Sequence, residues 1–156
     1  MLSRATSSMK RSLIAELVVG SLILLYIYTA SSKLLDFGSF RHVLSRSPLI
    51  GNFAPVVAWI LPSAEIVISV LLILPQTRRI GLWCSVVLMF AFTGYVGYML
   101  TFTSHLPCSC GGVLKQMTWK QHLVFNITYS LIAFLGIWLY QRPDQPETPV
   151  KHSAAY

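Results

Sequence analysis

Charged side chains are scarce in this sequence. Only 11% of the 156 residues are charged and five are acidic, against roughly 25% charged residues in an average soluble domain. Hydrophobic residues make up 54% of the chain. Because so few charges could not cover a water-facing exterior, the composition excludes an ordinary soluble domain. We therefore expect the surface of the folded chain to face membrane lipid.

No concentrated basic patch is present either, although the formal net charge is +7. The basic residues separate the apolar runs in short groups: Arg4/Lys10/Arg11, Lys33/Arg41/Arg46, Arg78/Arg79, Lys115/Lys120 and Arg142/Lys151. Nucleic-acid binding would require the charge to be gathered on one stripe or groove. The distribution therefore predicts no nucleic-acid partner. Cysteine is also rare, and three cysteines are too few for a disulfide scaffold.

Four long apolar runs are present, at about residues 12–31, 53–74, 80–103 and 122–140. A bilayer core of about 30 Å is crossed by about 20 residues of helix. The runs are continuous rather than alternating, and lipid requires each segment to pair its own backbone groups, so we expect helices. The first run exceeds the apolar core of a signal peptide, which favours a retained helix. The predicted fold is an all-α integral membrane protein with a four-transmembrane-helix bundle.

The basic residues of the loops weakly predict how the chain is oriented in the membrane. Lys and Arg are slightly more numerous in the two terminal segments and the middle loop than in the other two loops, which favours both termini inside. We expect residues 1–11 to be a cytoplasmic N-terminus and residues 12–140 to be the membrane domain. The proline-containing residues 141–156 are expected to form a disordered cytoplasmic tail. The predicted location is a bacterial inner membrane, crossed several times.

The first outer loop has apolar residues at helical spacing. They are Phe37, Phe40, Val43 and Leu44. The basic side chains of this stretch fall on the opposite side of such a helix. The pattern predicts a short amphipathic helix lying on the membrane surface.

Two of the three cysteines, Cys108 and Cys110, lie between the last two apolar runs. Residues 80–114 contain no Asp, Glu, Lys or Arg and are too long for one span, so the helix must break, with Pro107 and Gly111 as natural breakers. The pair should then lie just outside the membrane. Two thiols one residue apart can form a strained disulfide, which is easily reduced. This favours a pair that cycles between redox states.

Other interpretations of the pair remain open. It can be a static or idle pair, or it can bind metal with His105 and His122, although a zinc site requires about four ligands. A charged His105, three residues before Cys108, would favour the thiolate, whereas a loop histidine can also simply contact water. Cys84 would lie roughly 36 Å from Cys108 along a helix, too far to bond. A relay of cysteines across the membrane is therefore not expected.

Glu65 is the other informative position. It lies about ten residues before Pro75, near the bilayer midplane, where an ionisable group should be neutral or paired and face the bundle interior. One interpretation is a proton carrier or a ligand to a bound quinone. The alternative is an interhelical hydrogen bond to Tyr28, Tyr95 or Asn126.

Two further features are expected to be structural. Glu16, near the inner end of the first run, can reach water or the basic side chains of Arg78 and Arg79. Small residues such as Gly20 and Gly94 would allow neighbouring helices to approach closely.

Several short motifs follow one another along the helices: Tyr28-Thr-Ala-Ser-Ser-Lys33, Phe40, Leu61-Pro62 with Glu65, Cys108-Ser-Cys110-Gly111, Trp119 and Asn126. In order and spacing, over roughly residues 12–140, they resemble the MauE/DoxX family of small redox-associated membrane proteins. The resemblance implies a helper of disulfide or maturation chemistry outside the inner membrane. Its methylamine-utilisation members act with a thioredoxin-like partner in maturing the disulfide-rich small subunit of methylamine dehydrogenase.

By position, the resemblance makes Cys108 and Cys110 the candidate catalytic pair, with Lys33 and Glu65 as polar supports inside the bundle. His105 is a further candidate support because it lies three residues before Cys108. The leading hypothesis is a membrane thiol-disulfide oxidoreductase that exchanges disulfides with an exported thioredoxin-like protein, with a quinone as candidate cofactor. The alternative is a non-catalytic membrane chaperone or assembly subunit. A small transporter is supported by Glu65 alone.

Overall fold

The computed structural model describes residues 2–102 and 118–140, with the backbone alone for residues 2–8, and no strand occurs in them. The elements are α1 (Leu2–Leu35), α2 (Phe37–Ser45), the 3-10 helix η1 (Gly51–Phe53), α3 (Ala54–Ile73), α4 (Arg78–Phe102) and α5 (Trp119–Tyr140). Four of them, α1, α3, α4 and α5, are long and apolar enough to cross a membrane. The predicted all-α, four-helix membrane fold is confirmed.

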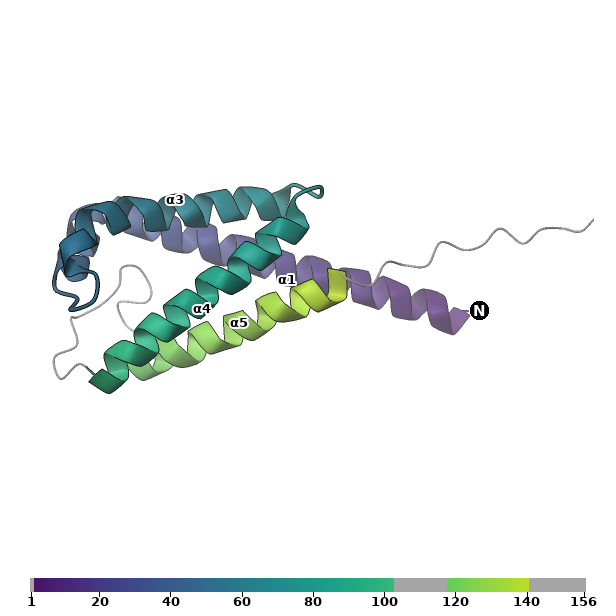
Figure 1. Cartoon of the computed structure of the whole chain (residues 1–156). Helices are drawn as coiled ribbons and strands as arrows, with labels where there is room; N and C mark the ends of the chain where they lie inside the picture. Colours follow the sequence, from purple (N-terminus) through teal and green to yellow (C-terminus); the bar gives the residue numbers. More distant parts are fainter. Residues whose placement is uncertain (1, 103–117, 141–156) are drawn as a thin grey trace, which may run out of the picture.

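The four long helices run alternately up and down (Figure 1). The main contacts join α1 to α3, α3 to α4, α4 to α5 and α5 back to α1. The N-terminal part of α1 extends past the other helices (Figure 1). We name the two ends of the bundle. The α2 end is the one where α1 ends, α2 lies and α5 begins. The Arg78 end is the opposite one, where α3 turns into α4.

The bundle is apolar both inside and outside. The central core takes side chains from all four long helices: Val18, Val19, Leu22, Tyr26, Ile68, Leu72, Leu82, Val86, Met89, Ala133 and Ile137. Large apolar side chains on every long helix are nevertheless exposed, including Leu24, Val67, Val87 and Leu131. In water such a surface would aggregate, whereas lipid chains cover it without cost. The chain is therefore a multi-pass membrane protein.

Two helix starts differ from the expected ones. α1 begins at Leu2 rather than near residue 12, because no Gly or Pro precedes Gly20 and a nucleated helix propagates readily through the Ala, Met, Lys and Arg of this stretch. α5 begins at Trp119 rather than near residue 122. Its start is a reciprocal capping box, in which Gln121 N–H donates to Thr118 Oγ1 at 3.3 Å and Thr118 N–H donates to Gln121 Oε1 at 2.8 Å.

The short helix predicted in the first loop is present as α2. Its apolar side packs against the first turns of α3, because Phe40 and Leu44 form a second buried cluster with Ala54 and Ala58. Arg41 on the opposite side is exposed. Tyr95 of α4 also contacts this region, donating from its hydroxyl to Ser47 Oγ at 3.1 Å. The loop helix is therefore packed onto the first turns of α3 rather than lying free on the membrane surface.

The close helix approaches occur at other glycines than those expected. A side chain at Gly20 or Gly94 would meet nothing within 4 Å. At Gly136 a Cβ would lie 2.9 Å from a Leu82 methyl and 3.0 Å from a Val18 methyl, so α5 packs closely against α1 and α4 there. At Gly81 it would lie 3.0 Å from the Leu72 nitrogen, which makes the turn from α3 into α4 tight.

Candidate functional site

The last turns of α1 place two polar side chains on the inner face of the bundle. Thr29 and Lys33 are four residues apart, so they lie on one side of the helix, and both are buried. Lys33 extends back along its own helix and donates from Nζ to the Thr29 carbonyl oxygen at 3.3 Å. This direction follows the tilt of helical side chains toward the N-terminus. The ammonium group therefore lies about one turn deeper in the bundle than its Cα atom.

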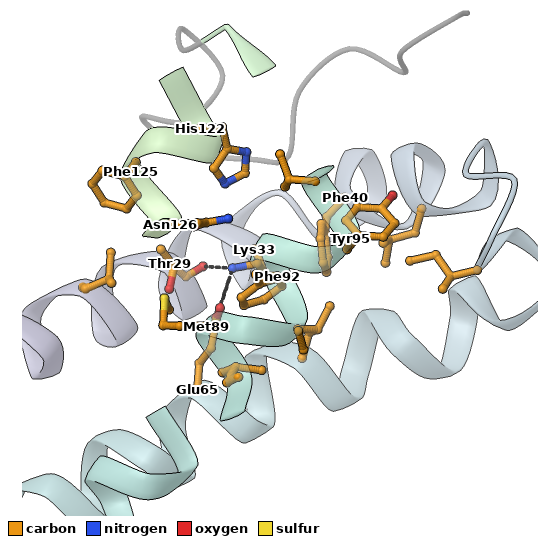
Figure 2. Close-up of a pocket in the computed structure, with 17 residues that line it drawn as sticks. Thr29, Lys33, Phe40, Glu65, Met89, Phe92, Tyr95, His122, Phe125 and Asn126 are labelled. Atoms are coloured by element: carbon orange, nitrogen blue, oxygen red, sulfur yellow. Dashed lines mark hydrogen bonds and ion pairs between the residues drawn. The ribbon is translucent and has the colours of Figure 1, made fainter. Parts of the chain in front are cut away.

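Glu65 of α3 meets this ammonium group. Lys33 Nζ donates to Glu65 Oε1 at 2.8 Å and to Oε2 at 3.1 Å (Figure 2). The side chains are 9% and 2% exposed, so both charges are removed from solvent and neutralise each other. The Phe40 ring of α2 adds a cation–π contact, with its centroid 5.9 Å from Lys33 Nζ. Charge neutralisation is what makes an ionised pair tolerable at this depth.

The prediction that Glu65 faces the bundle interior is confirmed, since the residue is 1% exposed. The expected partner was wrong. Tyr28, Tyr95 or Asn126 was predicted to hydrogen-bond Glu65, and the structure shows Lys33 in that role. The first apolar run ends near residue 31, but the helix continues to Leu35 and carries Lys33 inside the bundle, where the family resemblance implied a polar support. The pairing of the two charges allows the helix to carry a lysine inside the bundle.

A cavity of about 230 Å³ adjoins the ion pair at the α2 end. Its wall is mostly apolar, with Leu25, Phe40, Leu61, Phe92 and Phe125 among its residues. The polar side chains that line it come from four helices (Figure 2): Thr29, Lys33, Glu65, Tyr95, His122 and Asn126. Six of the positions that carry the family resemblance thus lie around one space: Thr29, Lys33, Phe40, Leu61, Glu65 and Asn126.

His122 was not predicted to line a site with Lys33 and Glu65, and Asn126 was expected only as one of three alternative hydrogen-bond partners of Glu65. His122 and Asn126 are four residues apart and therefore share one face of α5. That spacing, in an otherwise apolar helix, was the available signal in the sequence. Asn126 is 4% exposed, and its Nδ2 has no hydrogen-bond partner among the described residues.

The three other predicted site residues, Cys108, Cys110 and His105, lie outside the described residues. The third cysteine, Cys84, is a free thiol that is half-buried against the central core. Within residues 2–102 and 118–140, no group of three or more His, Cys, Asp or Glu side chains is placed to hold a metal ion.

A second polar cluster lies at the Arg78 end. Arg78 Nη1 donates to Glu16 Oε1 at 2.7 Å and also to the Tyr140 hydroxyl. Arg78 Nε donates to the Leu72 carbonyl oxygen at 3.0 Å, near the end of α3. The predicted contact of Glu16 with Arg78 is confirmed. This cluster joins Glu16, in the first half of α1, to the adjacent ends of α3, α4 and α5, and none of its side chains lines the cavity beside Lys33.

Comparison with protein families supplies an independent finding. The family model described as methylamine utilisation protein MauE matches residues 11–139. No curated protein and no solved structure matches the chain. The match concerns MauE alone, so the wider relationship to DoxX proteins stays a prediction. Because the match covers most of the chain, including nearly all of the four membrane-spanning segments and the cavity between them, the protein belongs to the MauE family.

Proposed function

We propose that this chain supports the maturation of exported proteins by exchanging disulfides with a thioredoxin-like partner through Cys108 and Cys110. The observation that carries the proposal is membership of the MauE family, which suggests an accessory role in methylamine utilisation for a membrane protein. Within that role, a membrane protein with two thiols separated by one residue is suited to pass a disulfide to or from a partner. The disulfide-rich small subunit of methylamine dehydrogenase is the candidate client.

Chain connectivity supports this proposal. Cys108 follows Phe102, the last residue of α4, by six residues, and Cys110 precedes Thr118, just before α5, by eight. An extended chain covers at most about 3.6 Å per residue. The pair is therefore tethered to the α2 end of the bundle, the same end as the Lys33–Glu65 ion pair and its cavity. We expect this end to face the exterior of the cytoplasmic membrane.

The proposed exchange is balanced between the two proteins. One cysteine thiolate attacks the partner disulfide, a mixed disulfide forms and one partner thiolate leaves. The second cysteine then attacks the mixed disulfide, so that Cys108 and Cys110 become oxidised and the partner becomes a dithiol. The reverse sequence of steps oxidises the partner instead, and the redox states of the two proteins set the direction.

The decisive experiment traps thiols in intact cells. External oxidant and reductant are varied, free thiols are alkylated, and the redox state of the pair is read by mass spectrometry in a Cys84→Ser background. The proposal expects the Cys108/Cys110 state to follow the external potential. Single variants Cys108→Ser and Cys110→Ser should capture a mixed disulfide whose attached protein can be identified. A pair that stays in one state throughout, with no captured partner, contradicts the proposal.

A non-catalytic chaperone or assembly subunit is the second candidate. It is favoured by the broad apolar helix faces, which partner helices can cover as well as lipid. The double variant Cys108→Ser/Cys110→Ser separates the two candidates. Disulfide exchange predicts that client maturation is lost, whereas the chaperone role predicts that maturation continues. The matched control is Cys84→Ser, which removes a thiol outside the 103–117 segment and should leave maturation unchanged.

A further inference from the structure

The cavity at the α2 end has a polar side whose charges are already satisfied. Lys33 contacts both Glu65 oxygens and the Thr29 carbonyl oxygen, so its ammonium group has three partners. The Thr29 hydroxyl donates to the Tyr26 carbonyl oxygen at 3.3 Å. The ion pair has no net charge. The cavity therefore offers little attraction to an ionic head group.

Asn126 is different, because its amide nitrogen has no partner among the described residues although the residue is 4% exposed. Figure 2 shows this nitrogen directed into the cavity, on the same side as His122 and Lys33. A buried donor left without an acceptor costs about 1–3 kcal/mol. An uncharged carbonyl oxygen in the cavity would accept its hydrogen and recover that cost, and His122 can offer a second hydrogen bond.

Among the residues that line the cavity, Ala91 is the one that is exposed, and it lies about midway along α4 between Arg78 and Phe102. This position favours an opening at the depth of the membrane. Around this position the bundle surface is apolar, with Val87 and Phe90 exposed. A ligand would therefore enter from the hydrocarbon region rather than from water. The volume of about 230 Å³ is smaller than the roughly 300–1,000 Å³ of a typical drug-sized site, so it suits a head group whose tail stays in lipid.

We infer that this cavity binds the uncharged, carbonyl-bearing head group of a membrane-dissolved amphiphile, with Asn126 Nδ2 donating to the carbonyl and the tail leaving past Ala91. Membrane quinones and acylglycerols both have this chemistry. The aromatic wall of Phe40, Phe92 and Phe125 favours a planar head. The inference does not depend on Cys108 and Cys110, because the cavity residues that support it all lie on the helices.

The test is equilibrium binding to the purified full chain in dodecyl maltoside micelles. The probes are radiolabelled decylubiquinone, a quinone, and radiolabelled monoolein, an acylglycerol, with oleate as the charged comparator. We expect one saturable site for at least one neutral probe, and its identity names the source of the ligand. Asn126→Leu should weaken that binding about tenfold, in line with the loss of one hydrogen bond. Asn52→Leu is the matched control, because Asn52 is exposed and does not line the cavity.

A second variant tests the entrance without changing the buried polar groups. Ala91→Trp places a large side chain at the exposed opening and should weaken binding of the same probe about tenfold or more, whereas Val87→Trp, one turn away and outside the cavity lining, should not. If neither neutral probe binds saturably, or if oleate binds as tightly as the two neutral probes do, the inference is wrong. It is also wrong if Ala91→Trp and folded Asn126→Leu both bind like the parent chain.

Discussion

The two ion pairs found among residues 2–102 and 118–140 lie in opposite kinds of surroundings. Lys33 and Glu65 are almost completely buried at the α2 end and adjoin a cavity. Glu16, which pairs with Arg78 at the opposite end, keeps 55% of its side chain exposed. A buried pair is costly to desolvate and contributes mainly by positioning, whereas an exposed pair is screened by solvent. The comparison indicates that polar groups at the α2 end line a cavity, whereas those at the Arg78 end attach neighbouring helices to one another.

The largest effect is expected from breaking the buried pair. Lys33→Met leaves the Glu65 carboxylate without its counter-ion and should lower the free energy of unfolding by about 3–5 kcal/mol. Unfolding in mixed micelles, followed by circular dichroism during an SDS titration, measures the change. The double variant Lys33→Met/Glu65→Met is the control, because it removes both charges and should recover most of the loss. If Lys33→Met is as stable as the parent chain, an unpaired Glu65 carboxylate does not destabilise the fold and the prediction is wrong.

A smaller effect is expected from Arg78→Ala at the other end. The substitution removes the hydrogen bonds to Leu72, Glu16 and Tyr140 from a side chain that is 15% exposed. We expect a loss of about 1–2 kcal/mol in the same unfolding titration. Arg79→Ala is the matched control, since Arg79 is the neighbouring exposed arginine, and its effect should stay within about 0.5 kcal/mol. If Arg78→Ala and Arg79→Ala lower the free energy of unfolding equally, the hydrogen bonds of Arg78 do not stabilise the bundle.

The smallest effect is expected from Glu16→Gln. The amide keeps a hydrogen-bond acceptor for Arg78 and loses only the charge, which is largely solvated. The change in unfolding free energy should be no more than about 1 kcal/mol and should shrink further at high salt. If Glu16→Gln lowers the free energy of unfolding as much as Lys33→Met does, exposure does not explain the difference between the two ion pairs.

The helices themselves could be predicted because their signals are local. Each apolar run and the loop helix at Phe37–Ser45 was recognised from consecutive residues. The start of α5 could also have been recognised, since Thr118 and Gln121 have the spacing of a capping box. Because residues 118–121 are mostly polar, apolar content alone predicts a later start, near residue 122.

The site was only partly predictable. Burial of Glu65 followed from its position in an apolar run, because lipid leaves an ionisable group no solvated alternative. Its partner did not follow, since Lys33 is 32 residues away and a lysine near the end of an apolar run ordinarily reaches toward water. The involvement of His122 and Asn126 depends on how α5 is rotated about its axis, and no stretch of residues encodes that by itself.

Continuous apolarity and the need to pair every backbone group in lipid were enough to establish four membrane-spanning helices from the amino-acid order alone, since both conditions act within a single segment. Which polar side chains meet inside the bundle depends instead on the depth and rotation of separate helices. Packing sets those quantities, as at Gly136, where α5 approaches Val18 and Leu82. The Lys33–Glu65 pair and the cavity beside Asn126 exist only once these helices are assembled.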